Sequence, residues 1–153
     1  MNVDMKFKKI IIYIIFNILC CCASSALAEE KKLIILASDN IETISLETIS
    51  NLYAFRQKLM PNSQKAQLTS LPMNSEDTIG FTQKFFNYYP YQLKRIWDQA
   101  IFSGKARRPK QFNNTVDLLY FIKNNDNAIG YLIIENSKLP QMKEAYNVVA
   151  IIG

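Results

Sequence analysis

The sequence contains no histidine, and its three cysteines are consecutive, at residues 20–22. The rest of the chain therefore lacks the commonest general base, the usual transition-metal ligands and the thiol nucleophile. Only four glycines are present, and they form no glycine-rich phosphate loop of the usual spacing. We therefore expect a protein that binds rather than catalyses, and that uses no metal ion or other cofactor.

The N-terminus has the three parts of a cleavable secretory signal peptide. Lys6, Lys8 and Lys9 form a basic start, residues 10–22 are almost entirely apolar, and residues 25–28 read SALA. A membrane anchor is the alternative, but the apolar stretch is shorter than the roughly 20 residues that span a bilayer. The sequence therefore predicts export to the periplasm, removal of residues 1–28, and no membrane span in the remaining domain.

Cleavage after Ala28 would leave residues 29–153 as one domain without cysteine. A domain of about 125 residues can bury an adequate core without disulfide bonds. Removal of three lysines and Asp4 leaves 15 basic and 12 acidic residues, a net charge of +3. This excess is too small to predict nucleic-acid binding.

Short apolar segments alternate with segments of helical spacing along this domain. We expect strands at residues 33–37, 66–71, 129–134 and 148–152. We expect helices after the N-caps Ser45, Ser75 and Thr115, a further helix that begins at Pro90, and a C-terminal cap at Gly104. The pattern predicts a single α/β domain in which helices flank a small, mostly parallel sheet.

Polar residues follow the first two expected strands. In a parallel sheet these two loops would meet at the carboxyl edge, where open α/β sheets bind ligands. We expect an anion to contact Ser75 and the backbone N–H groups of the turn that follows it, which includes Asp77 and Thr78, with Ser38 and Asn40 opposite. Ordinary turn and capping chemistry is the alternative explanation for all five residues.

A basic loop follows the expected cap at Gly104. Lys105, Arg107 and Arg108 are its main charges, with Lys110 after Pro109. The loop is a candidate for holding an anion or an acidic protein partner, and a simple solvated surface is the alternative.

Aromatic residues gather just before this loop. They are Phe85, Phe86, Tyr88, Tyr89, Tyr91 and Trp97. Most of them have helical spacing and are expected in the core, but the consecutive tyrosines cannot all be buried. The exposed ones would add an aromatic surface for a partner.

Three motifs occur in the order seen in a known family. Along the chain, residues 45–53 read SLETISNLY, residues 97–109 read WDQAIFSGKARRP, and residues 127–131 read NAIGY. From about residue 33 to residue 152 the chain resembles the short phosphate ABC transporter substrate-binding-like proteins, relatives of one lobe of periplasmic phosphate-binding proteins. The resemblance implies a single lobe of the type II periplasmic-binding-protein-like fold, and a solute-binding function.

The phosphate contacts of the larger relatives are mostly replaced here. Aligned with them, Ser75 is retained, Leu71 stands at the arginine position, and Glu76 and Asp77 replace a glycine-threonine pair. Thr78 occupies a position where many short relatives have arginine. Two carboxylates beside an anion site repel phosphate at close range, so we expect weak phosphate binding.

Three functions follow from these observations as hypotheses. The first is an exported solute-binding-like domain, which would need a second copy of the chain or a partner to close on its ligand. The second is a module that has lost its small ligand and binds another envelope protein. The third, a hydrolase, would need Glu76 or Asp77 to pair across a deep pocket.

Overall fold

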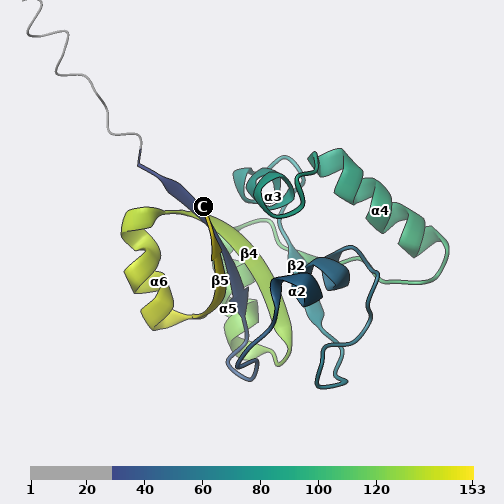
Figure 1. The fold of residues 1–153 in the computed structure, drawn as a ribbon, viewed down its shortest axis with the longest axis horizontal. Helices are drawn as coiled ribbons and strands as arrows, with labels where there is room; N and C mark the ends of the chain where they lie inside the picture. Colours follow the sequence, from purple (N-terminus) through teal and green to yellow (C-terminus); the bar gives the residue numbers. More distant parts are fainter. Residues whose placement is uncertain (1–28) are drawn as a thin grey trace, which may run out of the picture.

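The computed structural model describes residues 29–153, and the expected signal peptide at residues 1–28 lies outside the described residues (Figure 1). The strands are β1 (Lys31–Ala37), β2 (Gln67–Ser70), β3 (Lys110–Gln111), β4 (Ala128–Glu135) and β5 (Asn147–Ile152). The helices are α2 (Leu46–Tyr53), α3 (Glu76–Gly80), η2 (Phe81–Phe85), α4 (Pro90–Phe102), α5 (Thr115–Asn124), η3 (Asn136–Lys138) and α6 (Leu139–Ala145).

The five strands form one sheet in the order β3-β2-β4-β1-β5. β2 pairs in parallel with β3 and with β4, whereas β1 pairs antiparallel with β4 and with β5. Four strands therefore share one direction and β1 runs against them. The domain is mixed α/β, with helices around an open sheet. Because β1 is antiparallel to β4, the loops that follow β1 and β2 do not lie at the same edge of the sheet.

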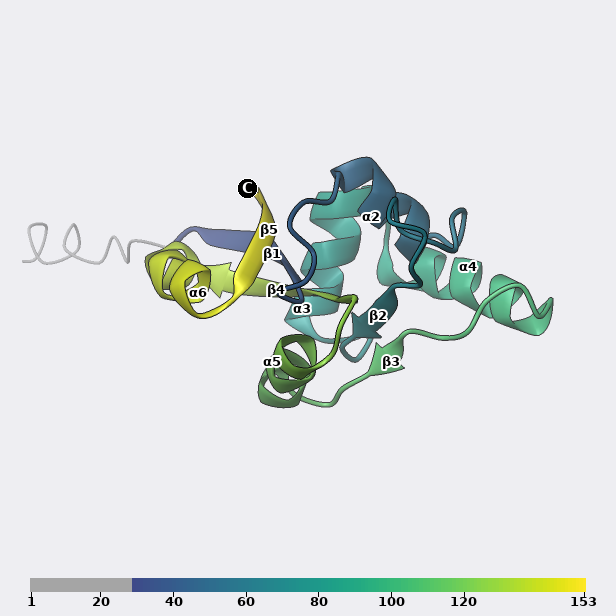
Figure 2. The ribbon, with the colours of Figure 1, turned by 90° about the horizontal axis from the view of Figure 1, so that it is seen from below.

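The continuous apolar run of β1 is explained by its place inside the sheet, between β4 and β5, where both of its faces are covered. Leu33 and Ile35 belong to one buried cluster, while Ile34 and Leu36 belong to another on the opposite face. Successive side chains of a strand point to opposite faces, so a strand covered on both sides needs apolar residues at every position. Figure 2 shows α2 and α5 on opposite faces of the sheet.

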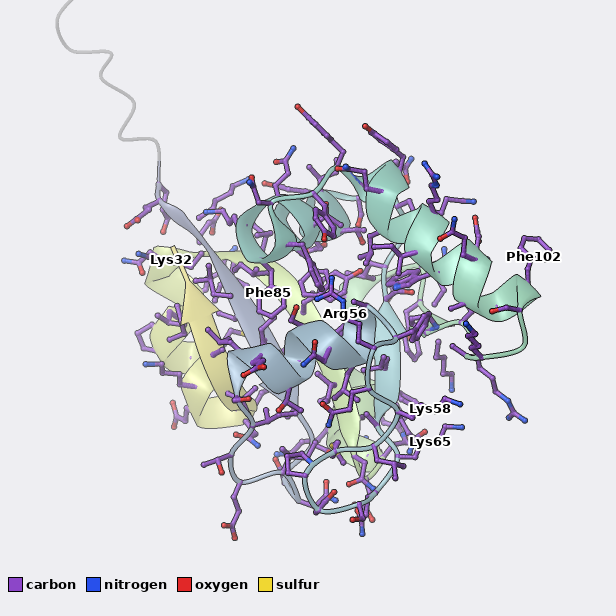
Figure 3. All side chains as sticks on the ribbon, turned by 45° about the vertical axis from the view of Figure 1, so that its right-hand side comes forward. Lys32, Arg56, Lys58, Lys65, Phe85 and Phe102 are labelled. Carbon is purple, nitrogen blue, oxygen red and sulfur yellow. The ribbon has the colours of Figure 1, made fainter. Side chains whose placement is uncertain are left out.

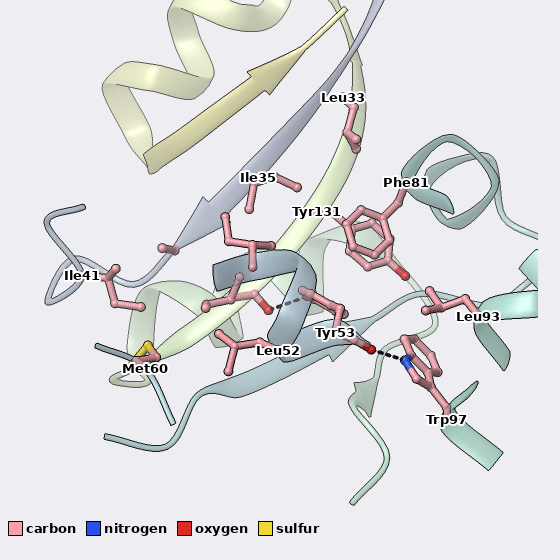
Figure 4. Packing of buried hydrophobic residues seen from close by; sticks show 13 residues of the cluster. Leu33, Ile35, Ile41, Leu52, Tyr53, Met60, Phe81, Leu93, Trp97 and Tyr131 are labelled. Carbon is pink, nitrogen blue, oxygen red and sulfur yellow. Dashed lines mark hydrogen bonds between the residues drawn. The ribbon is translucent and has the colours of Figure 1, made fainter. Parts of the chain in front are cut away.

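The larger cluster joins β1 and β4 to α2, η2 and α4 (Figure 4). Its centre is aromatic: the rings of Phe81 and Tyr131 stack with centroids 3.9 Å apart. The Tyr53 hydroxyl donates to two strand carbonyls, and Trp97 Nε1 donates to the Tyr53 carbonyl oxygen at 2.7 Å. The described members of both clusters lie within residues 33–152, and they form the core of the domain that the structure describes.

Most of the expected helix ends are confirmed. Ser45 and Ser75 each accept the backbone N–H three residues ahead, α4 begins at Pro90, and Gly104 has a φ of 69°. The expected cap at Thr115 is wrong, because Asn114 caps α5 by accepting the N–H of Asp117 at 2.8 Å. Asparagine satisfies the first-turn N–H as well as threonine does, so the sequence offered two adjacent candidates.

The helix α6 was not expected from the sequence. It is short, begins with Leu139 and Pro140, and has no fully buried residue. No helix in residues 29–153 is long and apolar enough to cross a membrane.

Candidate functional site

Ser38 and Asn40 hold the end of β1 to the start of β4. The Ser38 hydroxyl donates to Asn40 Oδ1 at 2.7 Å and accepts the N–H of Ala128 at 3.0 Å. Asn40 in turn exchanges hydrogen bonds with Asn127, through both the side chain and the backbone N–H of that residue. These polar atoms are therefore used to join two strands.

The loops after β1 and β2 lie at opposite ends of the sheet. β4 runs parallel to β2 but antiparallel to β1, so the carboxyl end of β1 lies beside the amino end of β4. The expectation that Ser38 and Asn40 face Ser75 is therefore wrong. It assumed a parallel β1, and a doubly buried apolar strand can pair in either direction.

The partly buried Ser75 and the fully buried Thr78 form a hydrogen-bonded junction between α3 and the sheet. Ser75 Oγ accepts the N–H of Thr78 at 3.2 Å. The fully buried Thr78 hydroxyl donates to the carbonyl oxygen of Leu71 at 3.1 Å and bonds the Tyr131 hydroxyl at 2.9 Å. Burial raises the pKa of Tyr131 to about 12, so this phenol stays neutral at physiological pH.

The two carboxylates of α3 have separate partners. Asp77 Oδ1 accepts the N–H of Ile133 at 2.8 Å, and burial raises the pKa of Asp77 above its ordinary value. Glu76 forms an exposed ion pair with Lys31 at 2.6 Å. Each acid thus joins α3 to a different strand, and the two do not form the pair across a pocket that the hydrolase hypothesis needs.

A cavity of about 580 Å³ lies between the segment that follows α2 and the loop that follows α4. Its lining includes residues 65–68, which lead into and form the start of β2, and the loop of residues 104–110. The cationic side chains on its lining are Lys58, Lys65, Lys105, Arg107, Arg108 and Lys110. No acidic residue is among the described residues that line it.

Little of this positive charge is neutralised within the described domain. Arg108 bonds Asp98 at 2.6 Å, and the same carboxylate also pairs with Lys94. The other five cationic side chains form no ion pair with any residue of the described segment. All six residues are exposed, so the cavity presents a positive rim to solvent.

The inner surface of the cavity is apolar and partly aromatic. Leu52 and Phe121, both buried, line it together with the half-buried Phe55. Lys110 Nζ lies 4.1 Å from the centroid of the Phe121 ring. The Phe55 ring also packs against Trp97, with centroids 6.3 Å apart, and thus connects the cavity to the core.

The structure brings the predicted basic loop together with two lysines that sequence reasoning missed. Lys58 and Lys65 come from the segment after α2, where Leu59 pairs with Lys65 and Ser63 takes a left-handed φ of 63°. This turn folds the segment back on itself and places both lysines close together on the lining of the cavity (Figure 3). A second cluster of positive charge after α2 was the available sequence signal.

The predicted aromatic surface is divided by the fold. Trp97 is buried, and Phe85 and Phe86 pack against the larger core cluster. Tyr89 and Tyr91 are exposed and stack on each other with centroids 5.9 Å apart. These two tyrosines lie at the start of α4, whereas the basic loop follows the end of α4.

Comparisons with known proteins do not identify a relative: no protein-family model matches the chain, and neither a curated protein nor a solved structure matches it. Within residues 29–153, no group of three or more acidic, histidine or cysteine side chains is placed to hold a metal ion. The basic cavity is therefore the arrangement on which a function can be argued.

Proposed function

We propose that the domain is an exported, non-enzymatic, solute-binding-like protein that binds an anion in the basic cavity. The observation that carries this proposal is the rim itself. Six cationic residues from two separate segments converge on one cavity with no acidic residue on its described lining. Such convergence of like charge is costly unless an anion relieves the mutual repulsion.

The family resemblance supports the same class of function. The motif at residues 97–109 supplies the end of α4 and three of the six cationic residues that line the cavity. The mixed α/β architecture is compatible with a single lobe of the type II periplasmic-binding-protein-like fold, and we include that fold in the proposal. The secretory features of residues 1–28 support a periplasmic location.

The turn at Ser75 is a poorer anion site than the cavity. Ser75 Oγ already accepts an N–H, and the Thr78 hydroxyl is buried between Leu71 and Tyr131. Asp77 and Glu76 add negative charge at the same turn. We therefore propose that phosphate is not held tightly here, in contrast to the larger relatives that the chain resembles.

Isothermal titration with tripolyphosphate, a small multivalent anion, tests the proposal on residues 29–153. We expect binding that weakens as salt is added and that is reduced by the double change Lys105→Ala and Arg107→Ala. Ser75→Ala, which removes the alternative anchor, should leave the affinity unchanged. Loss of binding in Ser75→Ala alone, or no binding to the unaltered domain, would contradict the proposal.

A second function, binding to another envelope protein, is favoured by the exposed aromatic rings of α4. Tyr91 is 67% exposed, and Phe102 at the far end of the helix is 90% exposed. Exposed aromatic rings are enriched at protein interfaces. A stoichiometric partner captured from periplasmic extract, and lost on Tyr91→Ala with Phe102→Ala, would support this function; sedimentation analysis would show whether the partner is a second copy.

A further inference from the structure

We infer that the basic cavity takes an organic polyanion with an aromatic part, the chemical class to which nucleotides belong. This inference rests on the proposed anion-binding function and adds the nature of the ligand. It comes from the size of the cavity, its aromatic inner surface and the distribution of charge around it.

The volume of the cavity suits a ligand much larger than inorganic phosphate. At about 580 Å³, it lies within the range of roughly 300–1,000 Å³ that is usual for sites of small organic ligands. A phosphate ion would contact one wall and leave the rest of the cavity filled with water. A ligand that reaches both basic segments must therefore carry a larger body between its charges.

The inner surface requires that part of this body be apolar. Leu52, Leu68 and Phe121 contribute aliphatic and aromatic groups to the lining, next to Phe55. A fully charged inorganic chain such as tripolyphosphate would lose water of hydration next to these apolar groups and would gain no favourable contact with them. A planar ring would instead bury apolar surface and stack against phenylalanine.

The charges around this apolar surface come from two separate segments of the chain. Lys58 and Lys65 come from the segment after α2, and the remaining cations come from the loop that follows α4. Lys110 already shows the pairing of a cation with an aromatic face, at 4.1 Å from the Phe121 ring centroid. The site thus has several cations that can bind the anionic groups of a ligand, and aromatic rings that can stack on its planar ring.

Titrations with ATP, tripolyphosphate and adenosine, without added Mg²⁺, separate these contributions. ATP has both the charge and the ring, whereas the other two have only one each. We expect ATP to bind about tenfold more tightly than tripolyphosphate, because a stacked base adds affinity, and adenosine to bind weakest. Trp97, the single tryptophan, packs on Phe55, so its fluorescence should change with ATP more than with tripolyphosphate.

Two sets of variants place the ligand in the cavity. The double change Lys58→Ala and Lys65→Ala should lower ATP affinity about fivefold, whereas Lys84→Ala with Lys143→Ala, of equal charge and outside the lining, should not. Phe121→Leu keeps an apolar side chain but removes the ring, and it should abolish the advantage of ATP over tripolyphosphate. Circular dichroism verifies that each variant is folded.

The outcomes distinguish this inference from the function on which it rests. Equal affinity for ATP and tripolyphosphate in the unaltered domain would overturn the inference and leave anion binding in place. No binding of either compound would overturn both. If Phe121→Leu does not fold, the affinities of the unaltered domain for ATP, tripolyphosphate and adenosine still show whether the aromatic ring contributes to binding.

Discussion

Lys110 Nζ lies 4.1 Å from the centroid of the Phe121 ring and 5.4 Å from that of Phe112. Lys110 begins the edge strand β3, whereas Phe121 lies in α5 and belongs to the smaller core cluster. The contact therefore joins the charged rim of the cavity to its apolar inner surface. It also holds a lysine that would otherwise be free to move in solvent.

The contact between Lys110 and Phe121 should contribute measurably to stability. We expect Lys110→Met, which keeps an apolar chain but removes the charge, to lower the free energy of unfolding by about 0.5–1 kcal/mol. Lys105→Met is the matched control, because Lys105 also lines the cavity but contacts no ring. Urea unfolding followed by Trp97 fluorescence measures both, and equal stabilities would show that the cation–π contact contributes nothing.

The hydroxyl of Thr78 should act in folding rather than in ligand binding. Thr78→Val leaves the buried Tyr131 hydroxyl and the Leu71 carbonyl oxygen without this partner. We expect the free energy of unfolding to fall by about 1–3 kcal/mol, while Thr78→Ser, which keeps the hydroxyl, loses less. The affinity for tripolyphosphate should not change in either variant, and a loss of affinity in folded Thr78→Val would restore the anion site at Ser75.

Asp77 should make the domain less stable as pH rises through the mildly acidic range. Burial, with help from neighbouring Glu76, raises the folded-state pKa of Asp77 above 3.8, and Lys31 and the Ile133 N–H oppose this only in part. The folded protein therefore keeps a proton that the unfolded chain has already lost. The stabilisation is complete below pH 3.8 and disappears as pH rises through the folded-state pKa.

Asp77→Asn tests this pH dependence. The asparagine carbonyl oxygen can still accept the Ile133 N–H, but the side chain has no charge to desolvate. We expect the variant to gain stability relative to the unaltered domain as pH rises from 3.5 to 7. Glu144→Gln, on the exposed side of α6, is the control for a lost carboxylate. A stability difference for Asp77→Asn that does not vary with pH would refute the prediction.

The sequence was informative where a feature depends on neighbouring residues. The apolar run of β1, the serine caps of α2 and α3, and the start of α4 at Pro90 are local, and all are present in the structure. The direction of β1 was not predictable in this way. Its residues satisfy a doubly covered strand in either direction, and pairing with the distant β4 and β5 decides between them.

The candidate site was only half visible in the sequence for a related reason. The basic loop at residues 104–110 is continuous and easily recognised. Lys58 and Lys65 become its neighbours only because α2, β2 and α4 pack together and the intervening turn reverses at Ser63. Ser38 and Ser75, in contrast, follow strands as ligand-binding serines do, but the structure uses both for hydrogen bonds within the fold.

Gly104, in the loop after α4, and Gly130, in β4, should respond differently to substitution. Gly104 has a φ of 69°, and a Cβ there would meet nothing within 4 Å. Gly130 has an ordinary φ, but its Cβ would lie 2.6 Å from both Thr69 Oγ1 and Ile122 Cδ1. The first glycine is required by backbone conformation and the second by close packing.

We expect Gly104→Ala to cost about 1–2 kcal/mol of unfolding free energy and Gly104→Asn clearly less, because asparagine tolerates the left-handed conformation. At Gly130 the order should reverse: alanine costs about 1–3 kcal/mol and the larger asparagine costs more. Urea unfolding of the four variants gives the comparison. The same order at both positions would mean that the two glycines are not required for these different reasons.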